Sequence, residues 1–400
     1  MRILFVSPYP PAKDGIGTYT QALMGALRTR GHAVAVVVPR PQPGSPPEVI
    51  GSLGARPADA GALLDLVCAW NPDLVHVQFA VAAFGTRTPA LLSWLRKLRS
   101  ARLVATVATL HEVTRDTAML GGPGRALYRA LSARCDRVIV HTRAAQAMLT
   151  GAIGLPGRQV TVIPHPRAKP PRAGSTPPDL RARFGLGNAE LLIAFGFVHV
   201  DKGLGDLVRA LRMLRASGTP LEGVRLVIAG TVRPRTGLFR LFELRDRAHL
   251  AGVMRLARRG GLDGLIVRTG YVPEADIAGW FQAAAAIVLP YRRTEGSGVA
   301  GIAATFAVPV LASTAGGLGE QYADGQWTFP PRAPRQLSHV LRRFLATAPQ
   351  RRGAPAAGLS PAAGPAPSLG LVVAATLDAY REAAPWILVA DPAWSVPDAR

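Results

Sequence analysis

The stretch Leu191–Gly203 reads LLIAFGFVHVDKG and decides the fold class of this chain. Its first five residues are apolar and run into Gly196, as a buried strand of a parallel sheet does. Lys202 then comes just before the amphipathic run 204–215, which predicts a helix. Backbone N–H groups at a helix start, together with one ammonium, form a site for a phosphate-bearing ligand. Lysine is also rare, because only Lys13, Lys97, Lys169 and Lys202 are lysines among 47 basic residues, which favours a need for a point charge here.

Outward from this stretch, short apolar runs alternate with longer amphipathic runs, a pattern typical of parallel sheets covered by helices. In the first half the pattern predicts strands at 3–7, 33–38, 74–78, 103–110, 138–141 and 160–163, and helices at 18–29, 60–70, 89–98, 124–133 and 143–149. The second half repeats the pattern, with strands at 191–195, 225–229, 265–269, 286–289 and 310–312, and helices at 204–215, 238–258, 274–282, 299–306 and 335–345.

We therefore predict an α/β protein with two doubly wound, Rossmann-like domains that face a central cleft. The amino-terminal domain is expected over residues 1–168, followed by a linker at 169–180, and the carboxy-terminal domain is expected over residues 181–348. A Pro- and Ala-rich flexible segment at 349–370 precedes a helix and tail at 371–400, and either domain is a candidate to receive that helix. Ligands of doubly wound sheets bind beyond the carboxyl ends of the strands, so the chemistry is expected there.

Bulk properties exclude several classes of protein. No apolar run approaches the roughly 20 residues of a membrane span, and the apolar start is too short for a signal peptide. Cys68 and Cys135 are not spaced as metal ligands, so we expect neither a disulfide framework nor a metal site. We expect a cytoplasmic protein. Its net charge of +22 is spread along the chain without a recognition motif, which argues against nucleic acid but predicts attraction to anionic substrates or a peripheral contact with the anionic inner face of a membrane.

The glycines at Gly15-Ile16-Gly17 resemble part of a dinucleotide-binding fingerprint, but three features argue against that function. Thr20 stands where the third glycine belongs, and the turn from Pro8 to Asp14 is long. The second predicted strand also lacks a following acidic residue to hold a ribose. The loop is better suited to a close approach between backbone and ligand.

Four segments with chemical side chains or glycines follow predicted strands. They are Asp14–Gly17, Thr109–Glu112, Phe195–Gly203 and Leu289–Val299. In the last segment a carboxylate, Glu295, precedes a glycine-rich turn into a predicted helix, which is again an anion-binding helix start.

Together these segments resemble a glycosyltransferase of the GT-B fold, in the retaining family 4 that uses nucleotide-sugar donors. The resemblance covers residues 1 to about 345 and rests on ordered motifs. These motifs are Ser7–Pro10 with Gly15–Tyr19, Asp73–Gln78, Thr109–His111, Val162–His165, Lys202–Gly203, Gly270–Pro273, Pro290–Tyr291 and Pro309–Ser313.

The resemblance implies a role for each matching residue. His111 would lie at the donor sugar, Lys202 would neutralise the departing diphosphate, and Glu295 would bind sugar hydroxyls. Backbone groups would complete the substrate-binding set: Gly15 and Gly17 at the phosphates, Val272 at the nucleobase, Gly296, Ser297 and Gly298 at the sugar or phosphate, with Gly196 and Val299 beside them. The resemblance implies a reaction that needs no metal. It also implies no cofactor, because the nucleotide sugar is itself a substrate.

Two positions depart from the family pattern. Ala303 replaces the second glutamate of the E-x7-E motif, which normally holds the ribose, and Phe197 replaces the arginine that usually accompanies the lysine. Phosphate neutralisation then falls on Lys202 with helix starts, or on another cation such as Arg233 or His199. These departures suggest a variant subgroup.

The expected partners are a UDP- or GDP-sugar and a sugar, lipid or small-molecule acceptor. The candidate acceptor loops, 8–19, 78–88 and 113–125, carry no readable code for that acceptor. Two alternatives stay open: a non-catalytic nucleotide-sugar-binding subunit, and an epimerase or phosphorylase of the same fold.

Overall fold

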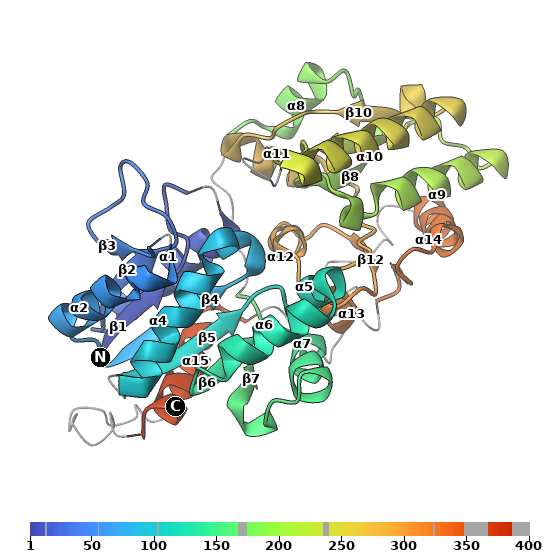
Figure 1. The fold of residues 1–400 in the computed structure, drawn as a ribbon. Helices are drawn as coiled ribbons and strands as arrows, with labels where there is room; N and C mark the ends of the chain where they lie inside the picture. Colours follow the sequence, from blue (N-terminus) through green and yellow to red (C-terminus); the bar gives the residue numbers. More distant parts are fainter. Residues whose placement is uncertain are drawn as a thin grey trace, which may run out of the picture. The chain divides into compact units, whose positions relative to one another are not determined.

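The computed structural model describes residues 1–12, 14–54, 56–101, 104–166, 174–234, 240–322, 325–347 and 367–385. The chain divides into two compact units, here called the amino-terminal unit (Met1–Pro166 with Pro367–Arg400) and the carboxy-terminal unit (Arg167–Ala366). Each unit is a parallel sheet wrapped by helices (Figure 1), which confirms the predicted fold class.

The amino-terminal unit has a seven-stranded sheet in the order β3-β2-β1-β4-β5-β6-β7. Its strands are β1 (Arg2–Val6), β2 (Ala33–Val38), β3 (Val49–Ser52), β4 (Leu74–Phe79), β5 (Ala105–Leu110), β6 (Arg137–Val140) and β7 (Val160–Val162). All neighbouring strands pair in parallel, and the strand order reverses between β1 and β4.

Helices cover both faces of this sheet, so alternate residues of each strand enter different cores. Leu4 and Val6 of β1 join a cluster with side chains of α2 (Ala60–Trp70), α4 (Thr88–Ala101) and α6 (Gly122–Ser132). Ile3 and Phe5 join a cluster with side chains of α1 (Gly15–Arg28) and α15 (Leu369–Ala383). Shorter helices lie at the carboxyl ends of the strands: α3 (Val81–Phe84), α5 (Val113–Leu120) and α7 (Arg143–Ala147). Burial on both faces explains why these strands are continuously apolar.

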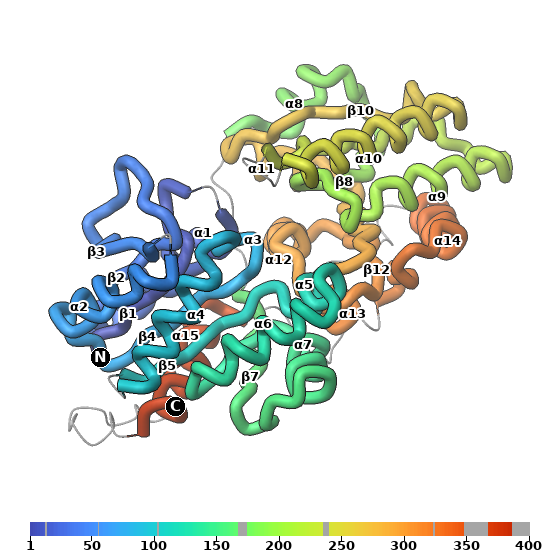
Figure 2. Tube along the Cα trace, in the orientation of Figure 1, coloured from blue at the N-terminus to red at the C-terminus, as the bar shows by residue number. Residues whose placement is uncertain are grey.

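The last described helix, α15, belongs to the amino-terminal unit. It contacts α1, β5 and β6, and its red tube lies beside β5 and β6 in Figure 2. The sequence left the partner of this helix open. The structure decides it through Val373 and Tyr380, which are fully buried in the amino-terminal core.

The carboxy-terminal unit has a six-stranded sheet in the order β10-β9-β8-β11-β12-β13. Its strands are β8 (Glu190–Phe195), β9 (Val224–Ala229), β10 (Ile266–Arg268), β11 (Ala286–Leu289), β12 (Val310–Ser313) and β13 (Thr328–Phe329). One face is covered by α9 (Leu204–Ala216), α10 (Arg240–Arg259) and α14 (Pro334–Ala346), and the other by α8 (Pro177–Arg183), α11 (Glu274–Ala283), α12 (Gly298–Thr305) and α13 (Gly317–Tyr322). The order reverses between β8 and β11, so both units have the doubly wound topology.

The structure corrects the sequence prediction in several short elements. Residues 177–180 belong to helix α8 rather than to a linker, because Thr176 and Asp179 form a capping box and Pro177 stands at the first helical position, all of which favour a helix start. The candidate acceptor loop 113–125 is mostly the helices α5 and α6. Strands β3 and β13, and helices α3 and α13, were not predicted, since each has six residues or fewer. The predicted flexible segment at 349–370 lies mainly outside the described residues, and Leu369 already begins α15.

Candidate functional site

The predicted site residues lie at the carboxyl ends of strands in both units. In the amino-terminal unit they follow β1 and β5, and in the carboxy-terminal unit they follow β8, β10 and β11. The strand order reverses between β1 and β4 and between β8 and β11. Doubly wound sheets bind ligands beside such reversals.

Gly15 and Gly17 stand in the first turn of α1. The side chain of Asp14 caps this helix by accepting hydrogen bonds from the N–H groups of Ile16 (2.8 Å) and Gly17 (3.4 Å). A Cβ at Gly17 would lie 3.2 Å from the carbonyl oxygen of Pro8, just after β1, whereas a Cβ at Gly15 would meet open space. Gly17 therefore allows close packing of the helix start against the segment after β1, and the exposed Gly15 is the one available to a ligand.

His111 follows β5 directly and is buried. Its Nε2 lies 2.7 Å from Oε1 of Gln78, and its Nδ1 lies 3.2 Å from Nε2 of His141. Gln78 also bonds His76, whose Nδ1 lies 2.6 Å from the hydroxyl of Tyr380 on α15. The predicted donor-sugar residue is thus part of a buried hydrogen-bond network across β4 and β5, and its Nδ1 faces His141 at the end of β6.

Burial keeps these imidazoles uncharged. It lowers the pKa of His76 to about 3, with a smaller contribution from His141. Burial also lowers the pKa of His141 to about 4, against the opposing effect of the Ile163 carbonyl. The pKa of His111 is well below its ordinary value, through burial first and then through the neighbouring histidines. All three rings are therefore neutral near pH 7.

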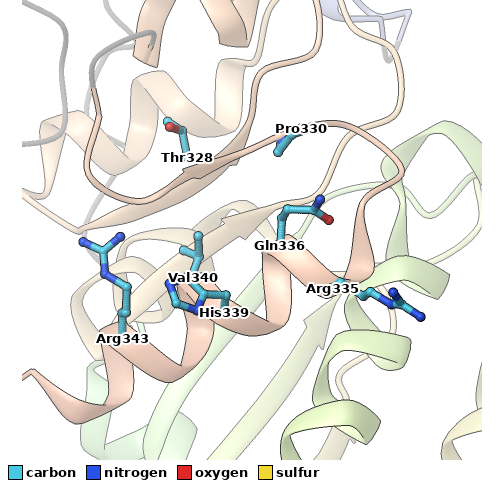
Figure 3. A pocket seen from close by; sticks show the side chains of 7 residues that line it. All are labelled: Thr328, Pro330, Arg335, Gln336, His339, Val340 and Arg343. Atoms are coloured by element: carbon cyan, nitrogen blue, oxygen red, sulfur yellow. The ribbon is translucent and has the colours of Figure 1, made fainter.

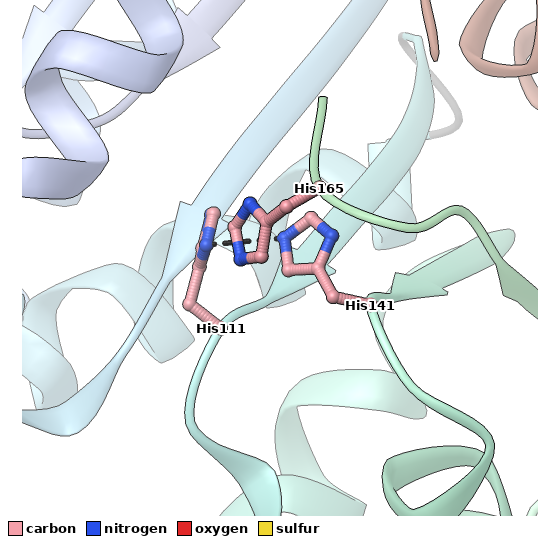
Figure 4. A group of neighbouring side chains, drawn as sticks. All are labelled: His111, His141 and His165. Atoms are coloured by element: carbon pink, nitrogen blue, oxygen red, sulfur yellow. Dashed lines mark hydrogen bonds between the residues drawn. The ribbon is translucent and has the colours of Figure 1, made fainter. Parts of the chain in front are cut away.

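His165 completes a cluster of three histidines with His111 and His141 (Figure 4). One ring nitrogen from each lies within 4.8 Å of the others. The ring of Tyr19 lies edge-on to all three, at centroid distances of 5.5, 5.7 and 5.6 Å. The sequence analysis assigned no role to His141 or His165. The available signal was that His141 ends the predicted strand 138–141 and that His165 comes two residues after the predicted strand 160–163.

Lys202 lies in the carboxy-terminal unit at the turn before α9. Its ammonium Nζ is 3.6 Å from the centroid of the Tyr291 ring, just after β11. The next residue, Gly203, has φ of +67°, and a Cβ there would lie 1.7 Å from the carbonyl oxygen of Pro290. No other residue fits this approach. Gly203 therefore holds the lysine at the end of β11.

Gly196, Ser297 and Val299 lie around the same strand ends. The hydroxyl of Ser297 bonds that of Tyr291 at 3.4 Å and accepts the N–H of Ala300 at 3.2 Å as the cap of α12. A Cβ at Gly196, where φ is +102°, would be 3.9 Å from Val299 Cγ2. Ser297 and Lys202 thus both contact Tyr291. Gly196 and Val299 lie close to each other at the ends of the neighbouring strands β8 and β11.

The loop that carries Glu295 is held to the segment after β12. A Cβ at Gly316, where φ is +49°, would be 1.9 Å from the carbonyl oxygen of Thr294, and the N–H of Gly317 donates to that oxygen. Glu295 is buried, while Gly296 and Gly298, which flank Ser297, are more accessible. The N–H and the carbonyl of Gly296 are bonded to the hydroxyl of Thr294, so the backbone of Gly298, the first residue of α12, is the group that suits an anionic or hydroxylated ligand.

The two departures from the family pattern have distinct structural settings. Ala303 is fully buried in an apolar cluster of α11, α12 and β12, so this position does not present a polar group. Phe197 is 42% exposed, and the guanidinium of Arg233 lies 5.6 Å from its ring centroid. A parallel bridge between Val198 and Val232 brings the two segments together. Arg233, one of the two cations named from the sequence, is thus placed next to the position of the missing arginine.

Val272 and Arg292 follow two other strands of the carboxy-terminal unit, β10 and β11. Val272 follows β10 and is partly buried against the apolar cluster of α11 and α12. Arg292 is bonded to Asp206 of α9 through Nε (2.7 Å) and a terminal nitrogen (2.8 Å), and this hydrogen bonding raises the pKa of its guanidinium. Arg292 therefore fixes the loop after β11 to α9 and is not an available cation for phosphate.

A cavity of about 400 Å³ lies elsewhere in the carboxy-terminal unit (Figure 3). Its lining comes from β13, the residues after it and α14: Thr328, Pro330, Arg335, Gln336, His339, Val340 and Arg343. No predicted site residue lines it, and Arg343 also contacts the Trp327 ring. We assign it no role. Within the described part of the chain, no helix combines the length and the apolar character that a membrane crossing needs.

Comparison with known proteins identifies the family of this chain. The model of Glycosyltransferase Family 4 matches residues 13–167, and that of Glycosyl transferases group 1 matches residues 189–347. A glycogen synthase of Mycobacterium tuberculosis is 27% identical, covering 88% of each chain. Sucrose-phosphate synthase from Thermosynechococcus elongatus has a TM-score of 0.74 at 19% identity, covering 98% of this chain and 100% of that one. HepE from Anabaena, solved in complex with UDP, also has a TM-score of 0.74 at 15% identity, covering 95% and 99%. The two family models together span most of the chain, so it belongs to the family 4, group 1 glycosyltransferases and is an enzyme with the two-domain GT-B fold.

Proposed function

We propose that this glycosyltransferase moves a sugar from a nucleotide-diphosphate sugar to an acceptor, with retention of configuration at the anomeric carbon. The observation that carries the proposal is the position of Lys202 in the carboxy-terminal unit, against Tyr291 and next to the accessible start of α12. HepE, which shares the fold, was solved with UDP, and this supports a uridine nucleotide as the first donor to test.

The proposed role of Lys202 follows from the charge that develops in the reaction. As the bond between sugar and diphosphate breaks, negative charge accumulates on the leaving oxygen and positive charge on the sugar. A cation held in place before the reaction binds that state more tightly than the ground state. The Tyr291 ring contacts the ammonium, and the close approach of Gly203 to Pro290 fixes the backbone beside it, so little reorganisation is needed when the charge appears.

Arg233 is the proposed replacement for the arginine that Phe197 displaces. Its guanidinium lies over the Phe197 ring, on the segment that follows β9, next to β8 in the sheet. A cation on a neighbouring strand end reaches the same edge of the sheet as one on β8. The diphosphate would then meet two cations from two strands, together with the backbone N–H group of Gly298 at the start of α12.

His111 is proposed to contact the donor sugar as a neutral ring. An imidazolium beside the anomeric carbon would repel the positive charge that develops there, so a low pKa favours the reaction. Burial and the neighbouring histidines supply that low pKa. The hydrogen bond to Gln78 fixes the orientation of the ring.

Release of nucleotide diphosphate tests the donor. The enzyme is incubated with UDP-, GDP- and ADP-sugars and an acceptor extract, and the released nucleotide and the anomeric configuration of the product are measured. One donor class should give release that depends on the acceptor, with retained configuration. Donor binding without release would instead identify a non-catalytic subunit, and phosphate-dependent or acceptor-free conversion would identify a phosphorylase or an epimerase. The peripheral membrane contact stays a prediction from the net charge of +22.

A further inference from the structure

The three histidines of the amino-terminal unit stand at the ends of three neighbouring strands. His111 follows β5, His141 follows β6, and His165 comes shortly after β7. Because these strands are parallel and adjacent, their carboxyl ends meet at one edge of the sheet. One ring nitrogen of each histidine lies within 4.8 Å of the others, and Figure 4 shows the three rings side by side.

The outer nitrogens of two of these rings are held by oxygen acceptors. Nδ1 of His141 is 2.8 Å from the carbonyl oxygen of Ile163, which only accepts, so Nδ1 carries the proton. In the orientation that the Gln78 amide has in the structure, its Oε1 lies 2.7 Å from Nε2 of His111 and accepts the proton of that nitrogen. Each neutral ring therefore turns an unprotonated nitrogen inward.

The two inward nitrogens, Nδ1 of His111 and Nε2 of His141, are 3.2 Å apart. Two unprotonated nitrogens cannot bond each other, so a cation between them satisfies this arrangement. Zinc binds histidine nitrogen at about 2.0–2.1 Å in tetrahedral geometry, which separates two such ligands by roughly 3.3 Å. Metal-bound histidines also donate their outer N–H to a carbonyl or similar acceptor, as both rings do here.

His165 supplies the third ligand and the route of entry. Its ring stacks on that of His141, with centroids 3.6 Å apart and planes inclined by 27°. Unlike the other two histidines it is exposed. Because His165 is the exposed member of the cluster, we expect an ion to enter beside it.

We propose that His111, His141 and His165 bind a divalent transition-metal ion, with Zn²⁺ as the best fit and the fourth position left to water. Three imidazoles favour Zn²⁺, Co²⁺, Ni²⁺ or Cu²⁺, whereas Mg²⁺ and Ca²⁺ prefer oxygen ligands. The proposal concerns binding, and the transfer reaction does not require the ion.

Cobalt absorbance tests the site directly, in protein without a histidine tag. Titration of Co²⁺ into the wild type should give visible bands of a tetrahedral nitrogen site that saturate at one ion per chain, and Zn²⁺ should remove them. His165→Gln and His141→Gln should each weaken Co²⁺ binding by about tenfold or more, since loss of an outer partner alone costs 10–100-fold. His339→Gln, an exposed histidine of the carboxy-terminal unit, is the matched control and should bind as the wild type.

Equal Co²⁺ affinity in the wild type and His165→Gln would overturn the proposal, and so would the absence of saturable visible bands. His165 is exposed, so this variant is expected to fold even if His141→Gln does not, and thermal melting verifies this. A second readout rests on the proposed function: a positive ion on His111 opposes the charge that develops on the sugar, so Zn²⁺ should inhibit the wild type more than His165→Gln. Failure of inhibition alone would count against the role of His111, whereas failure of cobalt binding would count against the metal site.

Discussion

Replacement of Lys202 by alanine is the sharpest test of the proposed chemistry. Loss of one preorganised group that stabilises developing charge typically costs about 3–4 kcal/mol, or 10²–10³ in turnover. The contact between the ammonium and the Tyr291 ring, at 3.6 Å, contributes roughly 0.5–1 kcal/mol at a partly exposed site. The effect on turnover should therefore be several times larger than the effect on stability.

The assay measures release of nucleotide diphosphate at saturating donor, beside the free energy of unfolding. Lys202→Ala should lower turnover at least a hundredfold while the fold remains intact. Lys97→Ala removes an exposed lysine of the same charge from α4 and should leave turnover unchanged. A folded Lys202→Ala enzyme with more than about a tenth of the wild-type turnover would remove the lysine from the mechanism, because the missing barrier would then be under about 1.4 kcal/mol.

Three more predictions concern single positions. Gly203→Ala places an alanine in the left-handed region, with its Cβ 1.7 Å from a backbone oxygen, and should lower the free energy of unfolding by roughly 2–4 kcal/mol. Gly218→Ala has a similar φ but open space around the Cβ, and should lower it by about 1 kcal/mol. Equal losses for the two variants in denaturant titrations would refute the clash at Gly203. His76 has a folded pKa of about 3 below its unfolded value, so its contribution to stability is complete above about pH 6.5 and is lost as the pH falls. His76→Gln should therefore reduce the slope of unfolding free energy against pH, between pH 6 and 4, by about 1.4 kcal/mol per unit, and an unchanged slope would contradict the buried neutral ring. Glu295→Gln keeps the shape but removes the charge, and should lower kcat/KM by roughly 10–150-fold through a loss of about 1.5–3 kcal/mol; unchanged kinetics with the preferred donor would exclude contact with the sugar.

The spacing of apolar residues along the chain was sufficient to predict the longer strands and helices. Strands such as β1 and β8 have both faces buried and read as continuous apolar runs, so their positions follow from composition alone. Helix α8 shows the opposite case. Its prolines at 177 and 178 were interpreted as a linker, although Thr176 and Asp179 form a capping box around them. Short strands such as β3 have too few residues to show a regular apolar pattern. They form by pairing with a neighbouring strand, as β3 does with β2.

Part of the candidate site could also be predicted from the sequence pattern. Lys202 and Glu295 follow apolar runs and stand out by their charge, so their place at strand ends could be predicted. The role of Tyr291 could not, because the contact of its ring with the lysine depends on the pairing of β8 with β11. The position of Arg233 beside Phe197 likewise depends on a bridge between segments more than thirty residues apart.

By itself the sequence determined two parallel α/β sheets and the residues that end their strands, because backbone hydrogen bonding and apolar burial act over a few neighbouring residues. Only the tertiary structure decided which strand ends lie side by side. Parallel pairing of β5, β6 and β7 brings His111 and His141 to 3.2 Å, although thirty residues separate them. Packing of α15 places the hydroxyl of Tyr380 on His76 across 304 residues. Such contacts depend on strand order and helix packing, which no local pattern of residues specifies.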